Sequence, residues 1–295
     1  MTDRFDRSIR FFGKEGQARL RAARVAVVGI GGVGTHVVQQ LALLGVGDLF
    51  LIDDEELDET NRNRYVGVRH DDPIPGTPKV DIGERLAQSI DSEIHTHNIP
   101  ASIASSEAIS ALTEAQYIFG CLDSEGARLM LTELSAAYAV PYIDVASDIL
   151  PGDRLHYGGR VCIAWNGEGC LACLDELDLA EAQIELAGEL ARKDRDAVYG
   201  VERGLLGAGG PSVVSINGVV ASHAVTEFML GITGIRPPHR LLIYRGDIGK
   251  VTVKTDSPHA DCYYCKGIRG QRTAVNLQRF LGSGIAQRQF SKRRL

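Results

Sequence analysis

Residues 24–64 read RVAVVGIGGVGTHVVQQLALLGVGDLFLIDDEELDETNRNR, and this stretch decides the fold. An apolar run over residues 25–28 leads into a glycine-rich turn, a helix-like stretch and a second apolar run that ends at Asp53. The glycines of the turn are Gly29, Gly31, Gly32 and Gly34. This order predicts a strand, a turn, a helix and a second strand, as in nucleotide-binding βαβ units.

The turn and the second strand each offer contacts to a nucleotide. The glycines let the backbone approach a phosphate, and the following helix presents free N–H groups and a partial positive charge to it. Asp53, at the tip of the second strand, can accept hydrogen bonds from ribose hydroxyls. We therefore predict a nucleotide site here. The stretch alone leaves open whether the nucleotide is a redox dinucleotide or ATP used for activation.

The composition is that of an ordinary globular protein. The chain has 295 residues, of which 44% are hydrophobic and 24% charged. Because the chain lacks an apolar run near the ~20 residues that span a bilayer, and its start lacks a signal-peptide core, we expect a cytoplasmic protein without membrane contact. The net charge of −6 gives no nucleic-acid signature. The basic stretch 266–295 is interpreted as a solvated extension.

Strands and helices alternate along the first half of the chain. Strand candidates cover residues 94–99, 116–122 and 141–146, and helix candidates cover residues 79–90 and 125–138. An amphipathic helix is expected within residues 1–22. This alternation predicts an α/β fold with a Rossmann-like, doubly wound, mostly parallel sheet. The long polar loop after Asp53 would lie at the carboxyl edge of that sheet, where ligands bind.

From residue 155 onward the pattern changes. Residues 155–165 predict an antiparallel strand or hairpin, residues 211–234 a core helix, and residues 239–246 and 249–255 two closing strands. We therefore expect an antiparallel C-terminal extension of the sheet. The segment 174–204 is acidic and then basic, which predicts a mobile loop that contains a helix.

Two CxxC pairs predict a structural metal site. They are Cys170 with Cys173 and Cys262 with Cys265. Four thiolates form the tetrahedral shell of a closed zinc site, and the two-residue gap lets one turn present both sulfurs to the ion. The alternative is two unrelated surface pairs. Cys121 and Cys162 lie in apolar runs and are predicted to be inert core thiols.

Residues beyond the second strand favour ATP over a dinucleotide. Asn61, Arg64 and Lys79 follow that strand, and Asp123 stands directly after the strand candidate 116–122. Lysine and arginine neutralise phosphate oxygens, and an aspartate can hold magnesium. A dinucleotide enzyme needs no such set, although each residue alone also fits a solvated loop charge.

The ordered motifs resemble those of the ThiF, MoeB and HesA adenylyltransferases, the bacterial relatives of ubiquitin-activating enzymes, and the MoeB type most of all. The resemblance covers about residues 4 to 266. It is carried, in order, by RFDRSIRFFGKEGQARL, GIGGVG, LIDDEELDETNRNR, GTPK, CLDSEGAR and the two CxxC pairs. It implies ATP-dependent adenylation of the C-terminal glycine carboxylate of a small ubiquitin-like β-grasp protein that ends in Gly-Gly, with release of pyrophosphate.

The resemblance also implies roles for individual residues. Asp53 would bind the ribose, and Asp123 would bind magnesium. Arg7 would reach into the neighbouring subunit's site, which implies a homodimer. The nucleotide loop would be Gly29, Gly31, Gly32 and Gly34, the phosphate ligands Asn61, Arg64 and Lys79, and the zinc ligands the four paired cysteines.

The resemblance divides the chain into an adenylation domain, residues 1–270, and a basic tail, residues 271–295. The nucleotide-binding half would cover about residues 1–150, and the substrate- and zinc-binding half about residues 151–270. Residues 174–210 would pass over the substrate's tail. Attack by a carboxylate on a phosphate would rely on Arg7, Arg64, Lys79 and magnesium to neutralise charge, without an acid or base.

Two departures from the family pattern qualify this reading. Tyr65 stands where many members have glutamine, and residues 174–261 contain no cysteine. Members that form a thioester or persulfide use a cysteine in that region, so we expect the reaction to stop at the acyl adenylate. An NAD-dependent oxidoreductase and a catalytically silent nucleotide-binding scaffold are the alternatives, and the carrier itself is not identified by the sequence.

Overall fold

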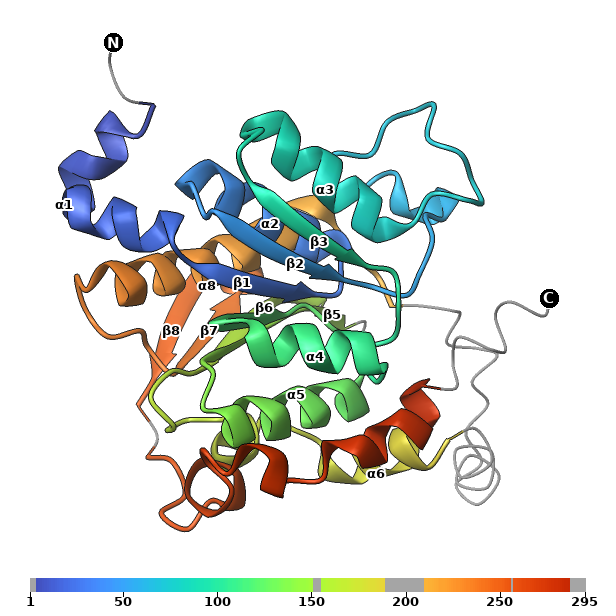
Figure 1. Cartoon of the computed structure of the whole chain (residues 1–295), viewed down its shortest axis with the longest axis vertical. Coiled ribbons are helices and arrows are strands. Elements are labelled where there is room, and N and C mark those ends of the chain that lie inside the picture. The colour runs from blue at the N-terminus through green and yellow to red at the C-terminus, as the bar shows by residue number, and fades with distance from the viewer. Residues whose placement is uncertain (1–3, 151–154, 189–209, 256, 287–295) are drawn as a thin grey trace.

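A computed structural model describes residues 4–150, 155–188, 210–255 and 257–286, which fold around one mixed sheet (Figure 1). Within these residues eight strands lie in the order β3-β2-β1-β4-β5-β6-β7-β8. The order runs outward in both directions from the pair β1 and β4, as in a doubly wound fold.

The first five strands are parallel to one another. They are β1 (Arg24–Val28), β2 (Asp48–Ile52), β3 (His95–Ile99), β4 (Tyr117–Gly120) and β5 (Tyr142–Leu150). The helices between them are α2 (Gly32–Leu44), α3 (Lys79–Ile90), α4 (Ser106–Glu114) and α5 (Glu125–Tyr138). The predicted Rossmann-like parallel sheet is confirmed. The sequence pattern does not predict α4, a short helix whose first turn is capped by the Ser105 hydroxyl, which accepts a hydrogen bond from Ala108 N at 3.0 Å.

The remaining strands are antiparallel, as expected for the C-terminal extension. They are β6 (His156–Ala164), β7 (Leu241–Arg245) and β8 (Lys250–Lys254). Between β6 and β7 lie α6 (Leu179–Ala187) and α8 (Val214–Thr233). The predicted core helix 211–234 is therefore confirmed, and it ends at Gly234 in a left-handed cap. Among the helices of the described ranges, none is both long and apolar enough to cross a bilayer.

Two apolar layers enclose the sheet. Alternate residues of β1 point to opposite layers, Val25 and Val27 to one and Ala26 and Val28 to the other. Helices α2, α3 and α8, with the end of α1 (Asp6–Arg21), cover the first face, and α4 and α5 cover the second (Figure 1). Strands buried on both faces read as continuous apolar runs, which is why the sequence reveals them clearly.

The described part of the basic C-terminal stretch differs from the expected solvated extension. Leu277 and Phe280 are 5% and 1% exposed and join the apolar layer over α5. Arg279 forms an ion pair of 2.5 Å with Glu133 of α5, a carboxylate that is itself buried. The apolar side chains of this basic segment thus pack it against α5. The charge of the segment alone does not predict this packing. Residues 287–295 lie outside the described residues.

Candidate nucleotide-binding and metal sites

Backbone hydrogen bonds bring three strand ends to one edge of the sheet. Gly29 N donates to Ile52 O, and Cys121 N donates to Val28 O, both at 2.8 Å. Gly29 has a φ of +88°, and a Cβ added to it would lie 2.5 Å from Cys121 O. Only glycine suits this position, because both the backbone angle and the close approach exclude a side chain. The ends of β1, β2 and β4 therefore share one site.

The glycine turn leads directly into the first turn of α2. A Cβ on Gly34 would lie 1.9 Å from Gly29 O, so the helix packs tightly on the turn. Gly31 is the N-cap residue and has no side chain to cap the helix. The first N–H groups of α2 are therefore suited to an anion, since an α-helix leaves them without intrahelical partners. This geometry fits the predicted nucleotide loop.

Asp53 links the second strand to the turn. Its Oδ2 accepts a hydrogen bond from Ile30 N at 2.7 Å, and its Oδ1 accepts one from Glu55 N at 2.8 Å. Burial raises the pKa of Asp53 to about 6, although the nearby charge of Lys79 acts in the opposite direction. The carboxylate is therefore ionised at neutral pH and becomes protonated in mildly acidic solution.

We expect ATP affinity to weaken by about tenfold between pH 7.5 and pH 5. With a pKa of about 6, Asp53 is about 90% protonated at pH 5, and the neutral carboxyl group is a weaker hydrogen-bond acceptor for the ribose hydroxyls. Isothermal titration of ATP across this range measures the effect. Asp53→Asn is neutral throughout and serves as the control for titration of the nucleotide itself. An identical pH dependence in both proteins would contradict the assignment of the ribose contact to Asp53.

Lys79 is a buried cation at the start of α3. Its side chain is 7% exposed, and its Nζ lies 2.5 Å from Glu55 Oε2. Burial alone would lower the pKa of Lys79, but the charges of Asp53 and Glu55 outweigh burial and hold that pKa above its ordinary value. The lysine therefore stays charged at any physiological pH, beside the residue predicted to bind the ribose.

Tyr65 lies between the cations and the glycine turn. Lys79 Nζ is 5.4 Å and Arg64 Cζ 5.6 Å from the centroid of its ring, and a Cβ on Gly31 would lie 3.5 Å from its hydroxyl. Aromatic faces attract cations at these distances. Tyr65, which departs from the family's usual glutamine, thus supports both predicted phosphate-binding cations, a role that its position in the sequence did not reveal.

Asn61 is buried and partly committed to local structure. Its Oδ1 accepts from Asp58 N at 3.0 Å in a reciprocal capping box around the short turn Glu59–Asn61. The amide nitrogen is the end of this side chain that could donate to a phosphate. A phosphate contact from Asn61 stays a prediction.

The two remaining predicted residues, Asp123 and Arg7, lie in different parts of the molecule. Asp123 is exposed and follows β4 at the same sheet edge as Asp53. Arg7 is exposed on α1, and Figure 1 shows this helix beside the amino ends of the strands, away from the carboxyl edge. The structure therefore brings Asp53, Arg64, Lys79 and Asp123 to one edge, whereas Arg7 does not join them within one chain.

Asn217 of α8 supports the glycine turn, a role that the sequence motifs do not predict. It is 1% exposed, and its Oδ1 accepts from the Ser147 hydroxyl at 2.8 Å. A Cβ on Gly32 would lie 2.5 Å from Asn217 Nδ2, so the start of α8 touches the turn. The sequence shows Asn217 only as a polar residue inside an apolar helix, which was the available signal.

The four paired cysteines form one buried cluster. Their sulfurs lie within 4.8 Å of one another, and two of the distances between the pairs are 3.6 Å (Cys170 to Cys262) and 3.8 Å (Cys173 to Cys265). Sulfurs that are each about 2.3 Å from a tetrahedral zinc lie about 3.8 Å apart, so the spacing fits this ion. The prediction that the pairs meet is confirmed, and the alternative of two unrelated surface pairs is wrong.

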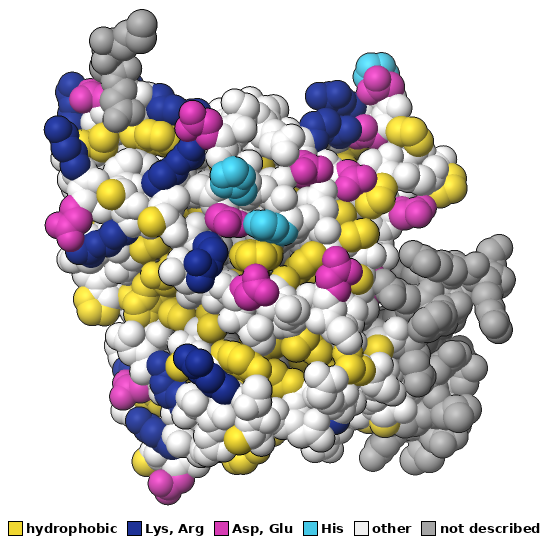
Figure 2. All heavy atoms as spheres, in the orientation of Figure 1, with side chains coloured by type: hydrophobic (Ala, Val, Ile, Leu, Met, Phe, Trp, Pro, Cys, Tyr) yellow, Lys and Arg dark blue, Asp and Glu magenta, His cyan; other side chains and the backbone are white. Residues whose placement is uncertain are grey.

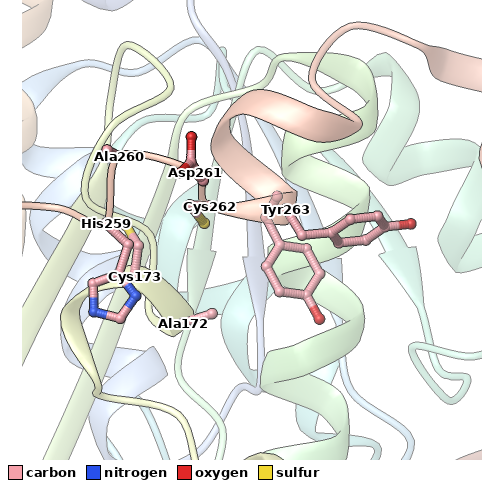
Figure 3. A pocket seen from close by; sticks show the side chains of 8 residues that line it. Ala172, Cys173, His259, Ala260, Asp261, Cys262 and Tyr263 are labelled. Carbon is pink, nitrogen blue, oxygen red and sulfur yellow. The ribbon is translucent and has the colours of Figure 1, made fainter.

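A hollow of about 570 Å³ opens beside this cluster. Figure 3 shows His259, Asp261 and Tyr263 around it, next to the Cys173 and Cys262 side chains. The other two cysteines do not belong to the cluster. Burial raises the pKa of the Cys121 and Cys162 thiols, which agrees with their interpretation as inert thiols.

The sequence of this chain matches a family of known proteins. The model of the ThiF family matches residues 5–276. The SAMP-activating enzyme E1 of Haloferax volcanii is 30% identical over 143 residues, 48% of this chain and 52% of the relative. The molybdopterin-synthase adenylyltransferase of Escherichia coli is 30% identical over 176 residues, 59% of this chain and 68% of the relative. The matched segments thus span about half to two thirds of these curated relatives.

Solved structures agree in fold. Escherichia coli MccB with ATP superposes with a TM-score of 0.69 at 20% identity, over 90% of this chain and 75% of that chain. At this identity the likeness shows the shared fold alone. The family match is independent of it and extends over nearly the whole chain. The resemblance inferred from the ordered motifs is confirmed, and the chain belongs to the ThiF family.

Proposed function

We propose that this chain adenylates the C-terminal glycine carboxylate of a small ubiquitin-like β-grasp protein, using ATP and releasing pyrophosphate. The observation that carries the proposal is the buried, charged Lys79 beside Asp53 at the glycine turn, with Arg64 against the same Tyr65 ring that Lys79 contacts. A cation set at a nucleotide loop suits a triphosphate. The names of the relatives agree, because they include adenylyltransferases of molybdopterin synthase and of the sulfur carrier protein ThiS.

The chemistry follows from charge. The incoming carboxylate and the α-phosphate are both negative, so the attack depends on Lys79 and Arg64 to neutralise the charge that builds on the phosphate oxygens. Asp123, exposed at the same edge, is the residue that would hold magnesium, which supplies further positive charge when bound. The carboxylate is already a nucleophile and pyrophosphate is a stable leaving group, so no side chain has to move a proton.

The proposed product is the acyl adenylate. Residues 174–261 contain no cysteine, and burial raises the pKa of Cys121 and Cys162. Neither thiol is therefore suited to attack the adenylate. A later sulfur transfer or conjugation step would belong to another protein.

Exchange of labelled pyrophosphate into ATP tests this function. We expect exchange with at least one β-grasp protein that ends in Gly-Gly, and none when its terminal carboxylate is amidated. Absence of exchange with every such carrier would contradict the proposal. Binding of NADH but not of ATP would favour the oxidoreductase alternative instead, and ATP binding without turnover would favour a silent scaffold. The cytoplasmic location expected from the composition stays a prediction.

A homodimer is part of this proposal. Figure 2 shows Lys and Arg side chains beside apolar surface over α1, where Phe11 is 63% exposed. Leu43 of α2 is 54% exposed and lines, with Val225 and Met229 of α8, a hollow of about 220 Å³. Phe11, one helical turn after Arg7 in α1, and the exposed Leu43 fit a subunit interface that would carry this arginine to a partner's site.

Mixing two inactive variants tests the shared site. Arg7→Ala and Lys79→Ala are each expected to be nearly inactive. In a mixed dimer, one site has its own Lys79 and the partner subunit's Arg7, so equal amounts should regain about a quarter of wild-type exchange when half of the dimers are mixed. The measurement is exchange activity after mixing under conditions that let subunits re-associate. Activity no higher than that of the separate variants would contradict a site shared between subunits.

A further inference from the structure

We propose that Glu185 of α6 is a positioning residue that fixes the Asp123 loop, which we define as residues 121–124 between β4 and α5. The proposal rests on the proposed function, because it assigns Asp123 to the magnesium of ATP. Asp123 itself is exposed, whereas the chain on both sides of it is held by side chains that are largely shielded from solvent, Arg128 and Glu185. The loop is thus restrained where its backbone lies, and its carboxylate faces solvent.

Arg128 holds the side of the loop that precedes Asp123. Its Nη2 donates to Leu122 O at 2.6 Å. The same guanidinium forms an ion pair of 3.5 Å with Asp144 of β5, whose side chain is fully buried. Because Asp144 belongs to a central strand, this contact ties the carbonyl before Asp123 to the rigid sheet.

Glu185 holds the side that follows Asp123. Its Oε2 accepts from the hydroxyl of Ser124 and, at 2.9 Å, from Gly126 N. Ser124 is the N-cap of α5, and its Oγ accepts from Ala127 N at 3.3 Å. A carboxylate from another helix therefore completes the cap of α5, at the helix end where a negative charge is favourable.

The side chain of Glu185 is enclosed beside this cap. It is 8% exposed, and a Cβ on Gly126 would lie 3.1 Å from its own Cβ. Helix α6 is also fixed at its other end, where Asp178 N donates to Glu125 Oε2 at 3.0 Å. Two contacts at opposite ends of α6 thus clamp it to the start of α5, and Figure 1 shows the two helices together.

This arrangement has a functional consequence. A metal ligand that is held before the ion arrives loses less freedom on binding, and partners that orient a ligand typically change metal affinity by about 10- to 100-fold. Loss of Glu185 would leave Ser124 and Gly126 without this acceptor and let the loop vary. Magnesium should therefore bind more weakly, whereas contacts of ATP to the glycine turn should persist.

Matched variants separate positioning from general stability. Glu185→Ala removes the acceptor, and Glu185→Gln keeps one amide oxygen that can accept from Gly126 N. Ser124→Ala removes the hydroxyl partner and serves if Glu185→Ala does not fold. The control is Glu227→Gln in α8, because the Glu227 carboxylate is also buried, at 4% exposure, and accepts hydrogen bonds from Arg236 Nη2 and His239 N.

Thermal unfolding with ATP gives a readout that needs no carrier. The rise in Tm with ATP and EDTA reports binding to the glycine turn, and the additional rise with ATP and magnesium reports the Asp123 loop. We expect Glu185→Ala, or Ser124→Ala in its place, to keep the first rise and lose most of the second. Glu185→Gln should keep most of both, and Glu227→Gln should lower Tm without changing either rise.

Pyrophosphate exchange then gives the magnesium requirement. We expect Glu185→Ala to raise the magnesium concentration for half-maximal exchange by about tenfold, with little change in the KM for ATP at saturating magnesium. A wild-type magnesium requirement in this variant, or an equal loss in Glu227→Gln, would overturn the inference. A magnesium-dependent rise in Tm that Glu185→Ala loses, in a protein without exchange activity, would support the positioning role and overturn only the proposed reaction.

Discussion

Replacing Lys79 with alanine is expected to lower pyrophosphate exchange by about 100- to 1000-fold, the usual cost of removing one preorganised charge partner from a transition state. Lys79 is suited to such a large effect because it is buried and held charged by Asp53 and Glu55. A cation of this kind acts without prior reorganisation, and little water competes with the phosphate for it. The measurement is the exchange rate at saturating ATP, with the carrier that supports wild-type exchange.

Three further variants make this prediction specific. Lys79→Arg keeps the charge but not the compact ammonium, and we expect intermediate activity. Lys254→Ala, at an exposed lysine of β8, should leave exchange within about twofold of wild type. Glu55→Gln removes the ion partner while leaving Lys79 in place, so it should not reproduce the loss. Equal losses in Glu55→Gln and Lys79→Ala would contradict a direct phosphate contact and indicate that the ion pair itself is what matters.

Lys79→Ala also carries a pH signature. The charge of Lys79 lowers the pKa of Asp53, opposing the larger effect of burial. Without the lysine, the pKa of Asp53 should rise further above 6, and the loss of ATP affinity in acid should begin at higher pH. A direct role of Lys79 at the phosphate and its influence on Asp53 are therefore separable in one titration series.

The parallel half of the fold could be predicted because its signals are local. Residues 25–28 and 49–52 are apolar runs buried on both faces, and the glycine turn between them requires a close backbone approach at Gly29. Patterns of this kind are formed by residues that are adjacent in the sequence, so they can be recognised without the structure. Asp53, Arg64, Lys79 and Asp123 could be predicted to lie together because parallel strands place their carboxyl ends at one edge.

The remaining parts depend on contacts between distant residues. Glu185 contacts Ser124 at a sequence separation of 61 residues, and Arg279 pairs with Glu133 at a separation of 146 residues. No local sequence pattern predicts either contact. Charge alone predicted a solvated stretch near Arg279, whereas the buried Glu133 makes the same charge favourable in a docked segment. Tyr65 could be recognised as a departure, but its contact with two cations depends on the loop's conformation.

Loss of the zinc predicted for the four-cysteine cluster is expected to destabilise the chain strongly. The cluster joins the turn after β6, with Cys170 and Cys173, to the segment after β8, with Cys262 and Cys265. Structural zinc contributes its binding free energy to folding, so loss of about 4 kcal/mol or more is expected, which corresponds to a fall in Tm of about 8–16 °C. Cys262→Ser should release the zinc, which is counted per chain by mass spectrometry of the metal.

Cys121→Ser is the matched control, because this thiol lies outside the cluster, and it should keep one zinc per chain. Four protein ligands would leave a zinc ion no open position, so we expect it to take no part in the reaction. Exchange by Cys262→Ser, assayed well below its Tm, should therefore stay within about threefold of wild type. A purified wild-type chain without zinc, or a Cys262→Ser variant with an unchanged Tm, would contradict a structural metal. If Cys262→Ser lost exchange activity but kept the Tm of the wild type, the cluster would have a part in the reaction. That result would contradict the expectation from its four buried sulfurs, which form a closed site.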